Sequence, residues 1–194
     1  GTINQIRMGF MSIKRLKNNA VKRILEQRKF GLFESLDDFL FRVDMDLSDA
    51  MALTNAQCFN SICQSMNHRE IAYIVAEFYL NDKDENPVKK APVTDKLTQY
   101  ELYQIELEVF GYPISIHPLE LYRPMLSKRI GYAKDIPYNV GKSVYLIGVY
   151  ITSKETRTSN KQTMEFLTLE DETDIYECIL FPSVFAEFGD MINW

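Results

Sequence analysis

Apolar residues recur every three or four positions through residues 1–80, which is the spacing of amphipathic helices. The stretch from Phe10 to Lys29 predicts two short helices joined by a tight turn, and Gly31 then ends the second helix. Ser35 and Ser48 each stand where a side-chain hydroxyl can cap the start of a further helix. This part of the chain therefore predicts four short helices arranged as two hairpins.

Two capping boxes predict the next helices, because in each an Asn or Thr is followed three residues later by Glu. The first box, Asn67 with Glu70, precedes a helix that we expect to end near Tyr79. The second box, Thr98 with Glu101, precedes another helix. That helix has four apolar residues at the spacing of a buried stripe, namely Leu102, Ile105, Val109 and Phe110.

From Ser143 onward the pattern changes to the Val, Ile and Tyr content of β-strands. Three strands are predicted, at Val144–Ile151, Met164–Leu169 and Ile175–Phe181. Residues 171–174 form the turn before the third strand, and a helix follows Pro182. Three strands and a helix make the first part of an OB-type barrel, which needs five strands to close. We therefore expect the sequence to be a piece of a longer protein, with Gly1 as a cloning remnant.

The predicted class is α+β, with a helical region followed by part of a β-barrel. Residues 81–96 are rich in charged residues and Pro, which predicts a linker. We expect a helix-hairpin-helix domain at residues 1–80, linker and connector helices at 81–142, and the N-terminal part of an OB-fold at 143–194.

The composition indicates where the protein is located and which cofactors it can bind. Hydrophobic residues make up 46% of the chain, but no apolar run is long enough for a membrane span or a secretory signal, so a cytoplasmic protein is expected. The three cysteines show no C-x-x-C spacing and only two histidines could join them as ligands. We expect buried free thiols, with no zinc or other cofactor.

Charge is distributed unevenly along the chain. The net charge is −5, yet residues 1–30 hold eight basic side chains and one acidic. Residues 31–110 hold six basic and fifteen acidic side chains, and residues 111–194 hold eight and eleven. Contact with phosphate is therefore expected at the N-terminal end of the chain.

The basic segment carries the apolar pattern of a helix-hairpin-helix pair, h-x-x-h-x-G-h-G-x-x-x-A-x-x-h-h. The apolar or small positions are filled by Phe10, Ile13, Leu16, Val21, Ile24 and Leu25. Arg15 and Lys17 occupy the two glycine positions, where a standard hairpin brings its backbone amides close to a phosphate. Side-chain charges can replace those amides. The candidate contacts to duplex backbone are Lys14, Arg15, Lys17, Asn18 and Lys22.

Several motifs in order resemble the alpha subunit of bacterial DNA polymerase III. They are Ile6–Lys14, Gly31–Phe39, Ala56–Ile62, Glu108–Leu119, Met164–Asp171 and Leu180–Pro182. The resemblance implies the tandem helix-hairpin-helix region and the start of the OB-fold of that family. It also implies that the metal-binding aspartates of polymerisation lie in a separate palm domain, so no catalytic or metal-binding residue is assigned here. Gln57 departs from the family, which has glycine at this position.

Three residues have structural explanations at this stage. Asp171 and Asp174 belong to the polar turn between strands, which needs no metal ion. His117 precedes Pro118, which suits the first position of a short helix, and it has no nucleophile beside it. We expect His117 to hydrogen-bond across this turn.

An OB-fold binds single strands by stacking bases on aromatic rings and by tracking phosphates with basic loops. Residues 153–161 are expected to form such a loop, with three cations and one acid. The candidate single-strand contacts are Tyr145, Tyr150, Lys154, Arg157, Lys161 and Phe166. The expected function is thus DNA positioning in replication without catalysis, with the hairpins facing duplex backbone and the OB-fold facing single-stranded template.

The sequence is also compatible with other functions and other parent proteins. Gln99, Leu102 and Tyr103 resemble the peptide with which polymerases bind the sliding clamp, although the capping box places them in a helix. The acidic middle of the chain and the lost glycines also suit a replisome protein-interaction module. The same architecture occurs in error-prone alpha paralogues. An anticodon-binding OB domain would explain only residues 143–194.

Overall fold

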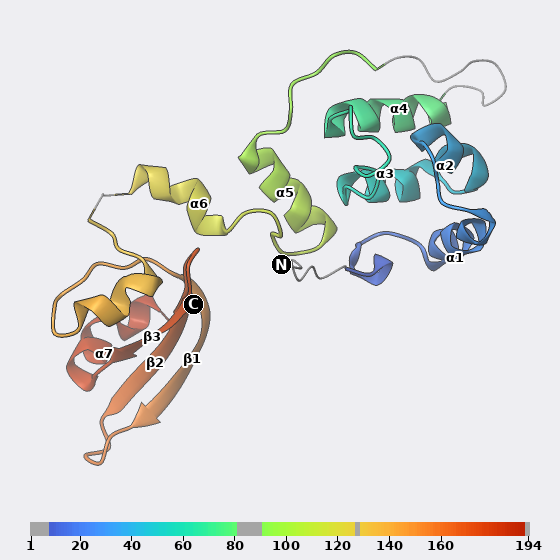
Figure 1. The fold of residues 1–194 in the computed structure, drawn as a ribbon. Helices are drawn as coiled ribbons and strands as arrows, with labels where there is room; N and C mark the ends of the chain where they lie inside the picture. The colour runs from blue at the N-terminus through green and yellow to red at the C-terminus, as the bar shows by residue number, and fades with distance from the viewer. Residues whose placement is uncertain (1–7, 81–90, 127–128, 193–194) are drawn as a thin grey trace. The chain divides into compact units, whose positions relative to one another are not determined.

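The computed structural model describes residues 8–80, 91–126 and 129–192, and these form two compact units that divide between Ile116 and His117 (Figure 1). The first unit is helical and the second contains a three-stranded antiparallel sheet, so the α+β class is confirmed. The division falls within the segment predicted as connector helices. Residues 81–90 of the predicted linker, and the first two residues of the Ile6–Lys14 motif, lie outside the described residues.

The helical unit follows the predicted order of elements. Its described elements are the 3-10 turn η1 (Phe10–Ser12), α1 (Asn18–Gln27), the 3-10 turn η2 (Arg28–Phe30), α2 (Leu36–Arg42), α3 (Leu47–Asn55), α4 (His68–Leu80) and α5 (Gln99–Val109). The first predicted helix is only a single 3-10 turn. Gly31 ends η2 with φ of 131°, a conformation that suits glycine.

The predicted helix caps are confirmed with one exception. The Ser35 Oγ accepts a hydrogen bond from the Asp38 N–H at 3.1 Å at the start of α2. Ser48 was wrong as the cap of α3, because Asp46 accepts from the Asp49 N–H at 2.9 Å and the helix already begins at Leu47. An aspartate earlier in the sequence therefore supplies the capping oxygen.

Both capping boxes are present, but the buried face of α5 differs from the prediction. Of the predicted apolar stripe only Val109 is buried, while Leu102, Ile105 and Phe110 are half-buried. The other buried residue of α5 is Glu106, whose carboxylate accepts from the backbone N–H groups of Ile114 at 2.6 Å and Ser115 at 2.9 Å. These bonds satisfy the buried charge and hold the loop after α5 in place.

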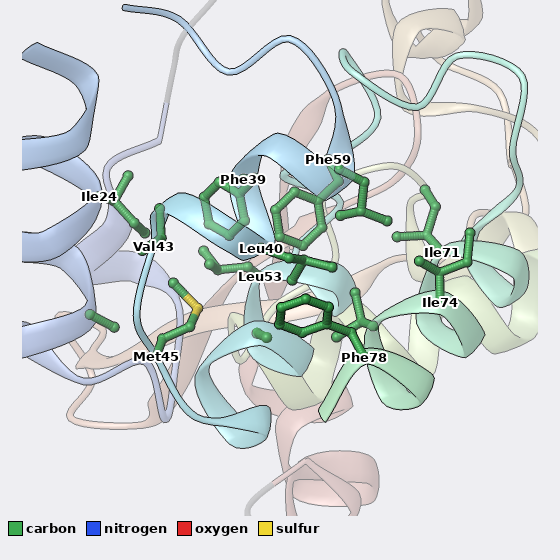
Figure 2. Packing of buried hydrophobic residues seen from close by; sticks show 14 of the residues in the cluster. Ile24, Phe39, Leu40, Val43, Met45, Leu53, Phe59, Ile71, Ile74 and Phe78 are labelled. Carbon is green, nitrogen blue, oxygen red and sulfur yellow. The ribbon is translucent and has the colours of Figure 1, made fainter. Parts of the chain in front are cut away.

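The core of the helical unit is aromatic and aliphatic (Figure 2). The rings of Phe39 and Phe59 meet edge to face with centroids 4.8 Å apart, and Phe39 meets Phe33 in the same way at 4.9 Å. Ile24 from α1 and Val43 after α2 belong to the same cluster, each 1% exposed. Burial of each large side chain contributes about 1.5–3 kcal/mol. The cluster therefore fixes the hairpin helix α1 against α2 and α3.

The second unit contains α6 (Pro118–Tyr122), η3 (Arg123–Met125), η4 (Ala133–Asn139), β1 (Val149–Arg157), β2 (Thr163–Glu170), β3 (Ile175–Leu180), α7 (Pro182–Phe188) and η5 (Gly189–Met191). The strands are ordered β1-β2-β3, and α7 packs against β2 and β3 (Figure 1). This arrangement is consistent with a partial OB-fold, as predicted.

The first strand lies further along the chain than predicted. Residues 153–157, expected in a loop, continue β1, and the turn to β2 takes only residues 158–162. Tyr145, expected within the strand, lies outside it in an isolated bridge with Ile130. β-Branched Thr152 and Thr156 suit an edge strand with solvent on one face, and this polar pattern was mistaken for a loop.

The turn before β3 is confirmed and is stabilised by Asp171. This carboxylate is 5% exposed and accepts from the Ala133 N–H at 2.7 Å and the Thr173 N–H at 2.7 Å. Burial raises the pKa of Asp171, but hydrogen bonds from the Thr173 hydroxyl and from the Ala133, Thr173 and Asp174 N–H groups outweigh burial and lower the pKa from its ordinary value. Asp171 therefore has structural partners in the turn.

Arg123 connects α6 to the same turn. Its guanidinium forms two hydrogen bonds to the Glu172 carboxylate, both 2.6 Å long, and lies 3.9 Å from the centre of the Tyr132 ring. The hydrogen bond from Arg123 lowers the pKa of Glu172. Because both side chains are largely buried, this forked pair fixes the helical segment on the sheet.

The cysteine prediction was correct only in part. All three are free thiols, but only Cys63 is buried, while Cys58 and Cys178 are exposed. Within the described ranges, no group of three His, Cys, Asp or Glu side chains could hold a metal ion. No helix in this part of the chain has the length and apolar character needed to cross a membrane.

Candidate nucleic-acid interface

The first hairpin keeps the backbone bend of a glycine although glycine is absent. Arg15, at the first glycine position of the motif, has φ of 66° in the left-handed region. Gln57, where the Ala56–Ile62 motif of the family has glycine, has φ of 57°. A side chain in this region costs roughly 1–2 kcal/mol, so packing of the surrounding helices must enforce the bend. The sequence shows that the glycines are lost, but it does not show the left-handed conformation at Arg15 and Gln57.

The second glycine position, Lys17, adopts an ordinary extended conformation and precedes α1. Its backbone N–H donates to the Asp49 Oδ1 of α3 at 2.9 Å, and Asp49 is 3% exposed. Backbone amides at a helix start are the groups that bind phosphate in such hairpins. Here an internal carboxylate already accepts from one of them, so phosphate contact must rely on side chains.

The predicted duplex-contacting residues differ in their partners. Arg15 pairs with Glu108 at 2.9 Å, and Lys17 pairs with Asp46. The Arg15 and Lys17 side chains are 75% and 59% exposed, and exposed pairs of this kind contribute little, so a phosphate can replace the acid. Lys22 is also exposed.

Lys14 and Asn18 lie on either side of this turn and are also exposed. The Lys14 N–H donates to the Val109 carbonyl at 2.8 Å, and its ammonium lies over Gly111, where an added Cβ would come within 2.6 Å of Nζ. A cation at the C-terminal end of α5 is favoured by the helix dipole. Among the described residues neither Lys14 nor Lys22 forms an ion pair with a carboxylate.

Three further cations of the basic segment lie in α1 and η2 and were not among the candidate contacts. Arg28 and Lys29 are exposed in η2, and the Arg28 guanidinium lies 5.3 Å from the centre of the Phe10 ring. Arg23 pairs with Asp44 at 2.9 Å. The excess of basic residues in positions 1–30 was the sequence signal for them.

The sheet brings together two of the six predicted single-strand contacts. Lys154 of β1, Phe166 of β2 and Ile179 of β3 are cross-strand partners and share one face. Phe166 is half-buried and Ile179 is 40% exposed. An aromatic ring beside a cation on an open sheet face is an arrangement suited to stacking a base and contacting its phosphate.

The other predicted single-strand residues lie elsewhere. Tyr150 pairs with Leu169, on the opposite face from Phe166, and its hydroxyl donates to the Ser153 Oγ at 3.2 Å. A bulge between Tyr150 and Thr152 separates the two parts of β1. Arg157 ends β1.

Two more of these candidates lie outside the strands. Tyr145 is 72% exposed. Lys161 lies in the turn between β1 and β2 with φ of 63°. The six residues therefore do not form one platform.

The clamp-like peptide and the His-Pro segment are both in helices. Gln99 is the first residue of α5, where Leu102 and Tyr103 are half-buried, and clamp binding stays a prediction. The structural explanation of His117 is confirmed, because its Nδ1 accepts from the Leu119 N–H at 3.2 Å and caps α6.

Comparison with known proteins agrees with this architecture. Residues 2–71 match the family described as helix-hairpin-helix motif. The DNA polymerase III subunit alpha of Aquifex aeolicus is 27% identical over 98% of this chain, and that of Bacillus subtilis is 28% identical over 97%. This chain is similar in sequence to a segment of such polymerases. An error-prone DNA polymerase of Cutibacterium acnes is also similar, with 27% identity over 94% of the chain. The chain spans about 16–18% of the length of these relatives.

Proposed function

We propose that this chain positions DNA within a replicative DNA polymerase and that polymerisation takes place elsewhere in the parent protein. Its helical unit contacts duplex backbone and its sheet contacts single-stranded template. Such a role belongs to the cytoplasm. The observation that supports it most is the retained left-handed bend at Arg15, which keeps the hairpin geometry while replacing glycine with a cation.

The duplex contact rests on side-chain charge. Lys14, Arg15, Lys17, Asn18 and Lys22 lie in or just after one turn and are all exposed. Each phosphate that a cation neutralises releases counterions, so this contact weakens as salt increases. Because Asp49 accepts from the Lys17 amide, the contact depends less on the backbone than in a standard hairpin.

The single-strand contact rests on the Lys154–Phe166–Ile179 row. Stacking on one aromatic ring contributes roughly 1–3 kcal/mol per base and tolerates any sequence. Arg157 pairs with Thr163 and therefore lies on the opposite face from this row, whereas Lys161 would add a cation at the β1–β2 turn.

Salt-titrated binding of short single-stranded and duplex oligonucleotides tests the proposal. We expect both to bind at low salt, and combined replacement of Lys14 and Lys22 by Ala to reduce the duplex salt slope by about two, one for each lost phosphate contact. Lys154→Ala is the matched control, since it removes a cation from the other unit and leaves the duplex slope unchanged. If neither oligonucleotide binds at low salt, the proposal is contradicted.

A second candidate is a module that binds other replisome proteins, such as the sliding clamp. The ion pairs of Arg15 with Glu108 and of Lys17 with Asp46 favour it, because they occupy two of the cations that DNA would need. Retention of replisome proteins by the chain together with failure to bind either oligonucleotide would support this candidate.

A further inference from the structure

A pocket of about 440 Å³ opens in the helical unit beside the hairpin. Four phenylalanines contribute to its walls, Phe10, Phe33, Phe39 and Phe59, and Ile62 adds a further apolar side. Phe39 and Phe59 are core residues, whereas Phe10 and Phe33 are only partly buried. The volume lies within the range of pockets that hold small ligands or a partner's side chains.

The opening of this pocket is apolar and positively charged. Arg28 lines it, with its guanidinium 5.3 Å from the centre of the Phe10 ring. Leu32 also lines it and is 85% exposed, and neighbouring Phe30 is 82% exposed. Arg28 has no ion-pair partner within the described residues, and neither Asp nor Glu lines the pocket there. The cation is therefore available to an acidic group that arrives with an apolar one.

The lining favours an apolar side chain over a nucleobase. A base is recognised by hydrogen bonds to its edges, yet Ser61 is the only described lining residue with a neutral polar hydroxyl or amide side chain. A buried aromatic or aliphatic anchor, surrounded by polar contacts that exclude water, is the usual centre of a peptide-binding site.

We propose that this pocket binds an acidic peptide segment of a partner protein through one large apolar side chain. The side chain enters between Phe10, Phe33 and Phe59, and an adjacent carboxylate pairs with Arg28. Leu32 covers the apolar anchor at the opening. None of the residues that line the pocket is a candidate duplex contact of the Lys14–Lys22 turn, so separate variants can test the two interactions.

Fluorescence anisotropy of a short end-labelled peptide, with a central Phe flanked by Asp and Glu, tests this assignment. Replacing the peptide's Phe with Ala should weaken binding about tenfold, as expected for loss of a buried anchor. Arg28→Glu should weaken it about fivefold or more through charge reversal at the opening. Leu32→Ser should also weaken it, and because Arg28 and Leu32 are exposed, both variants should fold, as far-UV circular dichroism would verify.

Lys29→Glu is the matched control, because it makes the same charge change next to Arg28 but does not line the pocket. It should leave peptide affinity within about twofold. The proposal would be overturned if Arg28→Glu and Lys29→Glu lost the same peptide affinity, or if the Phe and Ala peptides bound equally. Either result would show that the peptide binds only through non-specific charge attraction. Displacement of the peptide by a short oligonucleotide, with Leu32→Ser weakening both ligands, would also overturn it by assigning the pocket to bases. Loss of duplex binding in the Lys14 and Lys22 variant with unchanged peptide binding would support two separate sites.

Discussion

Asp49 holds the start of the hairpin helix, and its removal should have a large effect on stability. Its side chain is 5% exposed, and its Oδ1 accepts from the Lys17 N–H at 2.9 Å. Asp49→Ala leaves that partly buried donor unpaired, which costs about 1–3 kcal/mol. It also removes a carboxylate from the N-terminal end of α1, which contributes about 0.3–1 kcal/mol. We expect the free energy of unfolding to fall by about 2–3 kcal/mol.

Urea unfolding followed by far-UV circular dichroism measures this change, because the helical unit supplies most of the helix signal. Asp49→Asn retains an acceptor oxygen and should lose only about half as much. Asp44→Ala is the matched control: its carboxylate is 80% exposed and pairs with Arg23, so its removal should change stability by less than about 0.5 kcal/mol. If Asp49→Ala were as stable as the Asp44 variant, Asp49 would not anchor the hairpin.

Three further variants, one in the helical unit and two in the second unit, give testable outcomes. Gln57→Gly should raise the free energy of unfolding by up to about 1 kcal/mol, measured by the same urea unfolding, because relief of the left-handed strain exceeds the added chain entropy of glycine. Glu172 has a lowered pKa through its bond from Arg123, so its stabilisation is present above its unfolded pKa of about 4.3 and is lost as pH falls through the lower folded value. Between neutral and acidic pH, the free energy of unfolding should therefore fall less for Glu172→Gln than for the unaltered chain. An identical pH profile for the two proteins would contradict the assigned pair. Phe166→Ala should weaken the affinity for a labelled single-stranded oligonucleotide about fivefold, as measured by fluorescence anisotropy, whereas Tyr145→Ala should leave it nearly unchanged. A larger loss for Tyr145→Ala than for Phe166→Ala would show that the bases do not bind on the Phe166 face.

The sequence predicted the helices well because their signals are local. Ser35, Asn67 and Thr98 cap helices by bonding to backbone only two or three residues away. The first strand was misplaced because residues 153–157 are polar, and their strand conformation comes from pairing with β2. Such pairing depends on residues that are distant in the sequence.

The candidate site was only partly predictable for the same reason. Basic side chains near the hairpin were visible in the sequence, but the carboxylate that accepts from the Lys17 amide comes from Asp49, 32 residues away. The burial of Glu106 was not predicted, since the backbone N–H groups that its carboxylate accepts from lie in the loop at Ile114 and Ser115. Periodicity predicts which face of a helix is covered, but not that a loop will donate hydrogen bonds to an acid there.

In the proposed function the basic hairpin contacts duplex backbone and the Phe166 face contacts single strands. Amide chemical-shift mapping by NMR, with the chain titrated at low salt with a short duplex and separately with a single strand, tests it most directly. We expect the duplex to shift amides around Lys14 and Lys22, and the single strand to shift those around Lys154 and Phe166. Shifts confined to α4 and α5, or no shifts with either ligand, would contradict this proposal.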